Sequence, residues 1–199
     1  MPSLPGIAGI VLAAGRSARM GAPKPLLDLE GETFLARAER VLREGGCDTV
    51  LVVVPPGEAL GPMGAIARTG GAQVIENPDP EAEQIDSLRL GLEAVGDAEA
   101  AVVLPVDVLV KDPEVVRALC DAWRQQRAPV ARPVHGGRPG HPVLFARETW
   151  DELMAPDLED GARDVVHRHL KEILEVEVGD PGVLVDIDTP EEYVRRVGE

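Results

Sequence analysis

The chain has 199 residues, a length typical of one domain, and 44% of them are hydrophobic, which is enough to bury a core. Its net charge of -15 at pH 7 argues against nucleic acid and anionic membrane surfaces as partners, because both carry negative charge. No apolar run approaches the roughly 20 residues of a membrane helix. The chain opens without the pattern of a secretory signal, and Cys47 and Cys120 lack a metal-type spacing, so we expect a cytoplasmic protein.

The first part of the predicted fold alternates strands and helices. Short apolar runs predict buried strands, and segments in which apolar residues recur at helical spacing predict helices between them. The predicted strands cover residues 9–14, 49–54, 73–76 and 101–104, and the predicted helices cover residues 33–44, 62–68, 82–95 and 113–126. This alternation predicts an α/β fold with three layers, in which a mostly parallel, Rossmann-like sheet lies between helices on both faces.

The pattern changes after residue 127, where turns become frequent. Predicted strands cover residues 130–134, 142–145, 174–178 and 183–185, and predicted helices lie near residue 149 and over residues 162–170. Residues 189–192, Thr-Pro-Glu-Glu, have the sequence of a capping box with proline at the first helical position, which predicts a last helix. We expect this stretch to extend the same sheet, with room for an antiparallel strand.

The segment that follows the first predicted strand is basic. Residues 1–27 contain no Asp or Glu, but they include Arg16, Arg19 and Lys24. Small residues let the backbone approach a ligand, and backbone N–H groups and basic side chains bind phosphate oxygens. In an α/β sheet such a loop lies at the carboxyl end of its strand, where ligands bind. The sequence therefore predicts a phosphate-binding loop, although it contains neither a Walker motif nor the dinucleotide motif G-x-G-x-x-G.

Residues 12–24 read L-A-A-G-R-S-A-R-M-G-A-P-K, and they resemble the signature L-A-A-G-x-S-x-R-M-G-x-x-K of the MobA-like nucleotidyltransferases. Leu104–Asp107 resembles the metal-binding strand end of this family. Three later segments resemble motifs of its molybdenum cofactor cytidylyltransferase branch, namely Gly140–Phe145, Gly161–Arg163 and Asp186–Tyr193. The resemblance covers residues 7–193. It implies a single nucleotidyltransferase domain over residues 1–199, with a nucleotide-binding part over about 1–126 and an acceptor-binding part over about 127–199.

The resemblance also implies a reaction. Enzymes of this family transfer a nucleotide: an acceptor phosphate attacks the α-phosphorus of a nucleoside triphosphate, and pyrophosphate leaves. In the cytidylyltransferase branch the nucleotide is CTP, the acceptor is the molybdopterin form of the molybdenum cofactor, and Mg²⁺ is the cofactor. The double alanine Ala13-Ala14 favours this branch over the guanylyltransferase branch. Because the acceptor is already an anion, we expect catalysis by positioning and charge neutralisation.

Five charged residues carry the implied catalysis and metal binding. By resemblance, Arg19 and Lys24 would neutralise charge on the α-phosphate and the departing pyrophosphate, and Asp107 would hold Mg²⁺. The second carboxylate on the metal would be Asp186, whose spacing to Thr-Pro resembles that of the metal aspartate in related sugar nucleotidyltransferases, with Asp188 as a close competitor. Turn or helix-capping roles are the alternatives for all three aspartates.

The remaining site residues would bind the nucleotide and the acceptor. The nucleotide-binding residues implied by the motifs are Leu12, Ala13, Ala14, Gly15, Arg16, Ser17, Gly21 and Ser87. Ser87 belongs to a segment that resembles the family's N-P…S-L motif and would lie near the base; alternatively, its hydroxyl bonds to its own helix backbone. His141 and Arg163 would line the acceptor pocket, and their alternatives are a turn histidine and an arginine of a surface ion pair.

Two other functions fit the same residues. In the first, the acceptor is a sugar or polyol phosphate. In the second, the protein is a non-catalytic chaperone that hands the cofactor to a molybdenum hydroxylase, the partner protein that the resemblance implies. The presence of Arg19, Lys24 and Asp107 together argues against a pure binding protein. Residues 83–86 replace a glycine-containing stretch of the family motif, and Leu109 stands where the family usually has proline.

Overall fold

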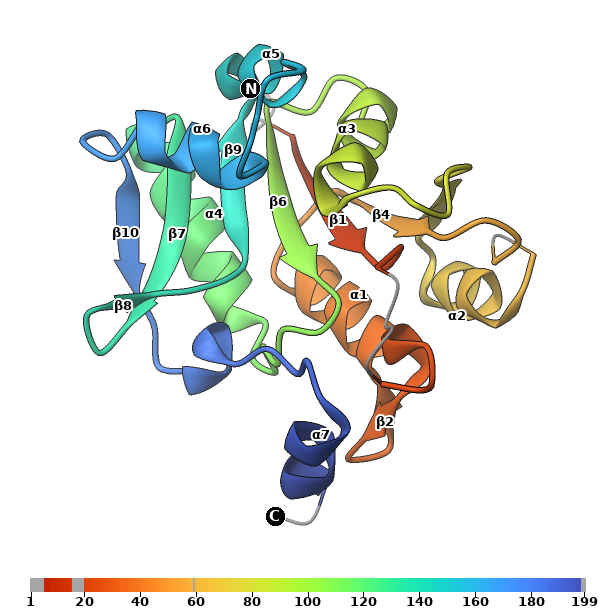
Figure 1. Ribbon diagram of the computed structural model, residues 1–199. Coiled ribbons are helices and arrows are strands. Elements are labelled where there is room, and N and C mark those ends of the chain that lie inside the picture. Colours follow the sequence, from red (N-terminus) through yellow and green to blue (C-terminus); the bar gives the residue numbers. More distant parts are fainter. Residues whose placement is uncertain (1–5, 16–19, 59, 198–199) are drawn as a thin grey trace.

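The computed structural model describes residues 6–15, 20–58 and 60–197 (Figure 1). The strands are β1 (Ile7–Leu12), β2 (Asp28–Leu29), β3 (Glu32–Thr33), β4 (Thr49–Val54), β5 (Gln73–Glu76), β6 (Ala100–Pro105), β7 (Val130–His135), β8 (Arg138–Pro139), β9 (Val143–Ala146) and β10 (Leu174–Glu177). The α-helices are α1 (Phe34–Glu44), α2 (Pro62–Gly70), α3 (Gln84–Ala94), α4 (Glu114–Gln126), α5 (Trp150–Leu153), α6 (Ala162–Arg168) and α7 (Pro190–Val197), and the 3-10 helices are η1 (Lys24–Leu26), η2 (Arg147–Thr149) and η3 (Pro181–Leu184). Within the described ranges, no helix is long and apolar enough to cross a membrane.

The central sheet has the strand order β10-β7-β9-β6-β1-β4-β5, and β8 pairs with β7. β1 pairs in parallel with β4 on one side and with β6 on the other. β9 runs antiparallel to both β6 and β7, and β10 is parallel to β7. The predicted α/β fold with a mostly parallel sheet is confirmed, and the later part of the chain supplies the antiparallel strand.

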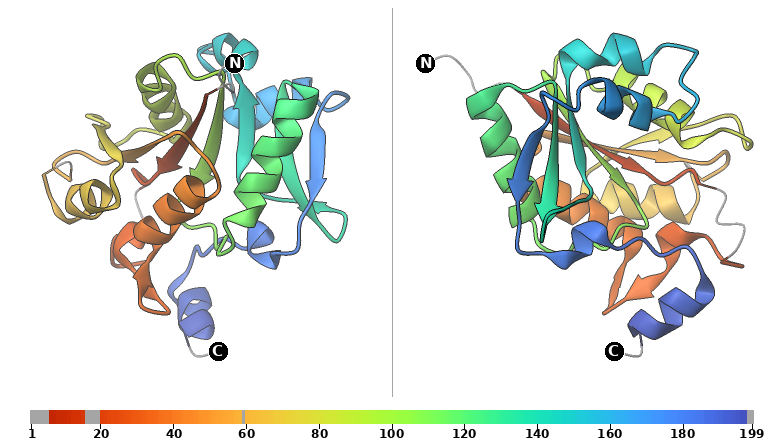
Figure 2. Two further views of the ribbon diagram at one scale, coloured as in Figure 1. Left: turned by 180° about the vertical axis from the view of Figure 1, so that it is seen from behind. Right: turned by 60° about the vertical axis from the view of Figure 1, so that its left-hand side comes forward.

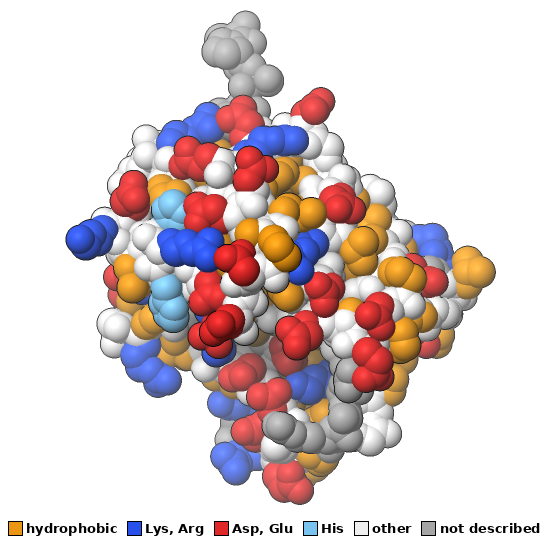
Figure 3. All heavy atoms as spheres, turned by 45° about the horizontal axis from the view of Figure 1, so that its top comes forward, with side chains coloured by type: hydrophobic (Ala, Val, Ile, Leu, Met, Phe, Trp, Pro, Cys, Tyr) orange, Lys and Arg blue, Asp and Glu red, His pale blue; other side chains and the backbone are white. Residues whose placement is uncertain are grey.

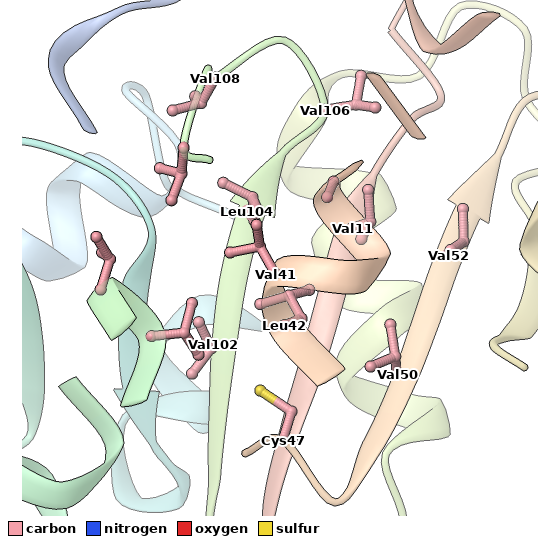
Figure 4. Packing of buried hydrophobic residues seen from close by; sticks show 14 of the residues in the cluster. Val11, Val41, Leu42, Cys47, Val50, Val52, Val102, Leu104, Val106 and Val108 are labelled. Carbon is pink, nitrogen blue, oxygen red and sulfur yellow. The ribbon is translucent and has the colours of Figure 1, made fainter. Parts of the chain in front are cut away.

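The sheet is covered by helices on both faces (Figure 2). Alternate strand residues point to opposite faces. Val11 and Val102 pack in one buried cluster with α1, α2 and α4, whereas Ile10 and Val103 pack in a second cluster with α3, α5 and α6. Figure 4 shows Leu42 of α1 in the first of these clusters, beside Val11 and Val102. Because both faces of β1 are covered, all six of its residues are buried, which explains its continuous apolar sequence.

One predicted strand is wrong: residues 183–185 fall largely within the 3-10 helix η3. The carboxylate of Asp180 accepts a hydrogen bond from the N–H of Gly182 (2.7 Å), which closes a turn, and the proline that begins η3 has no N–H to donate to a strand. A Cβ at position 182 would lie only 2.1 Å from the carbonyl oxygen of Leu109. Glycine permits this close approach, which brings the segment after η3 beside the segment after β6.

The last helix, α7, lies beside the hairpin formed by β2 and β3 (Figure 1). The predicted capping box is confirmed, because Glu192 accepts hydrogen bonds from the N–H groups of Asp188 and Thr189, and the Thr189 hydroxyl accepts one from the N–H of Glu192. The hydroxyl of Tyr193 donates to the carbonyl of Asp28 (2.5 Å) and ties the helix to the hairpin. The hairpin escapes prediction, since strands of two residues have no measurable periodicity.

The face that carries α3, α5 and α6 has acidic side chains spread over it, with separate basic ones among them (Figure 3). This distribution agrees with the net charge of -15. Because such a surface attracts anions poorly, a ligand rich in phosphate has to be held by a local group of cations and N–H donors.

Candidate active site

The carboxyl ends of β1 and β6 form the centre of the candidate site. Within the sheet, β4, the next strand of the sheet along the chain, pairs with one edge of β1, and β6 pairs with the other edge. Ligands bind at such a reversal of strand order in open α/β sheets. A cavity of about 320 Å³, the first cavity, lies there. Its lining consists of residues 12–15 after β1, Lys24 and Pro25 of η1, residues 82–84 and Ser87 at α3, Val106 and Asp107 after β6, and Asp188.

Three charged side chains form a cluster in this cavity. The ammonium of Lys24 donates hydrogen bonds to Asp107 Oδ2 at 2.8 Å and to Asp188 Oδ1 at 2.7 Å. The Lys24 side chain is only 12% exposed, and burial alone would lower its pKa. Hydrogen bonds and attraction from the two carboxylates outweigh burial and raise the pKa of Lys24 above its ordinary value. The lysine is therefore a permanent cation at neutral pH.

The backbone of residues 185–188 explains how a C-terminal aspartate reaches the cavity. The N–H of Leu109 donates to the Val185 carbonyl (2.8 Å), and the N–H of Ile187 donates to the Asp107 carbonyl (3.1 Å). Asp188 follows this pairing and enters the cluster with Lys24, whereas Asp186 does not line the first cavity. The structure thus brings Asp188, rather than Asp186, beside the lysine.

Ser87 lines the first cavity from α3, and its hydroxyl has a buried partner. The side-chain amide of Asn77 donates to Ser87 Oγ at 3.0 Å, and each of the two residues is 3% exposed. The N–H of Asn77 donates to the Val54 carbonyl, which fixes this residue at the carboxyl end of β4. The bond of Ser87 to Asn77 replaces the alternative in which the hydroxyl bonds to its own helix backbone.

The start of α3 carries the stretch in which the chain departs from the family motif. The Glu83 carboxylate accepts a hydrogen bond from the N–H of Asp86, and Asp86 in turn accepts one from the N–H of Glu83 (3.0 Å). Asp86 also forms an ion pair with Arg89 (3.1 Å). These acids therefore cap the helix, and Glu83 at the same time places a carboxylate at the rim of the first cavity.

A second cavity of about 370 Å³ adjoins the first, and Leu12, Glu83 and Gln84 line both. Apolar side chains from α3, β6, β9 and α6 make up much of its surface. The charged or titratable residues on its lining, besides Glu83, are Arg132, His141, Glu159, Asp160 and Arg163. This combination of apolar wall and charged groups suits a ligand that has both an apolar ring and an anionic group.

His141 and Arg163, both predicted for the acceptor, line this second cavity together. Nδ1 of His141 is buried and has no hydrogen-bond partner among the described residues. Burial lowers the pKa of His141; Arg163 acts in the same direction, and Asp107 and Asp186 act against it. The ring is therefore neutral at neutral pH. Arg163 forms no ion pair with any residue that the structure describes, so its charge is available to an anion.

Several predicted loop residues cannot be placed. Arg16, Ser17 and Arg19 lie outside the described residues, and their roles stay predictions. Gly21 is described and has a φ of 66°, a left-handed conformation that favours glycine, but it does not line the first cavity. The sequence reasoning missed the pairing of Asn77 with Ser87, because nothing in their spacing shows which polar group faces the other.

The chain matches the MobA-like NTP transferase domain over residues 9–173, and it therefore belongs to this family. It is 29% identical to a probable molybdenum cofactor guanylyltransferase from Synechococcus elongatus, over 94% of this chain and 95% of the relative. It is also 24% identical to the molybdenum cofactor cytidylyltransferase of Escherichia coli, over 93% of this chain and 92% of the relative. The chain is thus a nucleotidyltransferase whose relatives include both guanylyl- and cytidylyltransferases.

Among solved structures, the protein is similar to Rv0371c from Mycobacterium tuberculosis, with a TM-score of 0.83 and 30% identity over 98% of this chain and 99% of that one. A second structure of Rv0371c, described as a complex with manganese, has a TM-score of 0.75 and 28% identity over the same shares of the two chains. The predicted family and the predicted fold are both confirmed by these comparisons.

Proposed function

We propose that the protein transfers CMP from CTP to the phosphate of a molybdopterin-type acceptor and releases pyrophosphate. The observation that carries this proposal is the Lys24–Asp107–Asp188 cluster at the carboxyl ends of β1 and β6, next to a second cavity that contains His141 and Arg163. Relatives named molybdenum cofactor guanylyl- and cytidylyltransferases support the acceptor and leave guanine and cytosine as the candidate bases. The loop sequence L-A-A-G favours cytosine.

We infer Mg²⁺ as the cofactor and Asp107 and Asp188 as its protein ligands. Carboxylate oxygens are the donors that this ion prefers, and it typically takes one or two of them together with phosphate oxygens of a substrate. The described residues contain no group of three or more His, Cys, Asp or Glu that could hold a metal, so substrate oxygens would complete the coordination. The manganese in the complex of Rv0371c, another divalent cation, supports this inference. When bound, the ion would neutralise charge on the phosphates.

The chain's own residues would contribute position and charge. The N–H groups of Ala14 and Gly15 lie at the same cavity and can donate to phosphate oxygens, whereas that of Ala13 is bonded to the Val53 carbonyl. Lys24 is held in place by two carboxylates, stays protonated, and can donate to the oxygens around the α-phosphorus. The acceptor phosphate is already an anion, so its attack requires no base. Preorganised positive charge, rather than proton transfer, would account for the acceleration.

The acceptor would occupy the second cavity. Arg163 would bind its phosphate, because the guanidinium forms no ion pair with the residues that the structure describes. His141 would contribute a neutral ring to the wall of the cavity, because burial lowers its pKa. The apolar surface from Leu88 and Phe145 would pack against a flat heteroaromatic ring, which a sugar or polyol phosphate lacks.

Pyrophosphate release, measured with CTP, GTP, UTP and ATP in turn, with and without molybdopterin, tests this function. We expect pyrophosphate release only when both CTP and molybdopterin are present. Turnover with GTP in place of CTP would replace cytosine by guanine as the assigned base and would leave the assigned reaction unchanged. Turnover only with a sugar or polyol phosphate would overturn the acceptor, and CTP binding without turnover on any acceptor would indicate a chaperone.

A further inference from the structure

Asn77 and Ser87 form a polar pair buried between the end of β4 and the start of α3. Each residue is 3% exposed, although both are polar, and the pair joins the Asn77 amide to the Ser87 hydroxyl at 3.0 Å. Ser87 alone of the two lines the first cavity. A buried polar pair at the wall of a cavity, with one member facing that cavity, is a natural place for a hydrogen bond to a ligand.

The orientation of the Asn77 amide follows from its neighbours. The N–H of Asp79 donates to Asn77 Oδ1 at 3.1 Å, and only an oxygen can accept that bond. The other end of the amide, Nδ2, therefore faces Ser87 and donates to its Oγ. A serine hydroxyl has one hydrogen. Since Oγ already acts as acceptor toward Asn77, the hydrogen remains, and no acceptor for it exists among the residues that the structure describes.

The pair lies on the opposite side of β1 from the charged cluster. Asp107 follows β6, Asn77 bonds to the last residue of β4, and β1 runs between those two strands. A nucleotide whose phosphates lie at Lys24 and Asp107 would extend past residues 12–15 and place its base toward Ser87. This placement rests on the function proposed above.

We propose that Asn77 is a positioning residue that locks the Ser87 hydroxyl as a donor, and that the locked donor selects a base with a hydrogen-bond acceptor at that position. The pairing edge of cytosine presents two acceptors, N3 and O2. Guanine presents one acceptor, O6, and two N–H donors on the same edge. At most positions along that edge, the Ser87 hydroxyl would therefore face another donor. The pair therefore favours CTP over GTP and separates the two bases by the direction of one hydrogen bond.

The test is Asn77→Asp, which keeps the size of the side chain and the acceptor for the N–H of Asp79. As a carboxylate, the new side chain can only accept, so the Ser87 hydrogen turns toward it and is lost to the base. When protonated at lower pH, the new carboxyl can donate to Ser87 as the amide does. We expect CTP affinity of this variant to fall about five- to tenfold, relative to the wild type, as pH rises through the titration of that carboxyl, and GTP affinity to change less.

Three companion measurements make the result specific. In the Ser87→Ala background, Asn77→Asp should no longer affect CTP more than GTP at any pH, because the residue distinguishes the bases only through Ser87. Gln84→Glu adds the same negative charge at the rim of the same cavity without touching the pair, and it should weaken CTP and GTP alike. Thermal unfolding of each variant detects loss of the fold. The wild-type pH curve accounts for the neighbouring carboxylates Asp79 and Glu83, so the remaining change reports the hydrogen bond.

Two results would overturn the inference and leave the proposed function intact. In the first, the wild type turns over CTP, and Asn77→Asp binds CTP as tightly as the wild type at every pH. In the second, the affinities of Asn77→Asp for CTP and GTP fall equally. A wild type that prefers GTP would overturn the assignment of the base. If the folded wild type binds no nucleoside triphosphate at all, the proposed function fails, and the inference fails with it.

Discussion

The ammonium of Lys24 lies 2.7 Å from the carboxylate of Asp188, although 164 residues separate them in the sequence. The same ammonium bonds Asp107, which follows β6 near the middle of the chain. Lys24, at the start of η1, is therefore bonded to carboxylates from two distant parts of the chain. The capping box of α7, which holds the backbone of Asp188 through Glu192, contributes to the site from outside the sheet.

Replacement of Lys24 by alanine should lower turnover about 10²- to 10³-fold, the usual effect of removing one preorganised charge from the reacting centre. The fold should survive, because the two aspartates that lose their partner are partly exposed to water. Steady-state pyrophosphate release gives the activity, and thermal unfolding gives the stability. Near-normal turnover, or a loss explained by unfolding alone, would assign Lys24 a structural role.

The two C-terminal aspartates should respond differently to substitution. Asp188→Ala should raise the Mg²⁺ concentration needed for half-maximal activity, because Asp188 lies in the cavity with Asp107. Asp186→Ala should change it little, since that side chain does not line the first cavity. Mg²⁺ titrations of pyrophosphate release compare the two variants with Asp107→Ala. The reverse order of effects would restore the assignment suggested by the spacing before Thr189.

The central part of this architecture is predictable from the sequence, because its signals are local. Buried parallel strands read as continuous apolar runs, so β1, β4 and β6 are recognisable without any tertiary information. The position of Asp107 follows from the same reading, since a residue directly after a buried strand lies at the carboxyl edge of the sheet. The capping box before α7 is equally local, and it is confirmed in detail.

What escapes prediction depends on contacts between distant segments. The apolar residues 183–185 read as a strand, but the turn at Asp180 and the close approach of Gly182 to Leu109 make this segment a 3-10 helix. The choice between two aspartates two residues apart depends on that local path. Nothing in the sequence near position 77 indicates that its amide faces Ser87, since this contact exists only when α3 packs over β4.

Arg163→Ala should raise the KM for the acceptor about tenfold and leave the KM for CTP nearly unchanged. The guanidinium lines the second cavity and not the first, and its charge is not taken up by an ion pair among the described residues. A charge-assisted hydrogen bond of this kind contributes roughly 1.5 kcal/mol. Initial rates measured with each substrate varied in turn separate the two constants. An equal rise in both values would argue against a site dedicated to the acceptor.

Glu39 of α1 should make the stability of the protein depend on pH. Its side chain is 2% exposed, and neither carboxylate oxygen has a hydrogen-bond partner among the described residues. It lies against Gly70 of α2, where a Cβ would approach its oxygens to 2.7 Å. Burial raises the pKa of Glu39 from its ordinary value of 4.5 to about 7, although Arg43, 4.0 Å away, acts in the opposite direction.

The direction of the effect follows from that shift in pKa. Below the unfolded pKa both states carry the neutral carboxyl, and the fold bears no penalty; between 4.5 and about 7 the folded state alone stays protonated. Across this interval the unfolded chain gains stability by ionising while the folded protein cannot, so the folded state loses on the order of 3 kcal/mol relative to acidic conditions, and the loss is complete above about pH 7. Glu39→Gln stays neutral, so its free energy of unfolding relative to that of the wild type should increase between about pH 4.5 and about pH 7 and stay constant at higher pH. Urea unfolding of both proteins measures this difference, and Glu44→Gln, an exposed position on the same helix, is the matched control. A difference that stays constant across this range would show that Glu39 is ionised in the folded protein throughout.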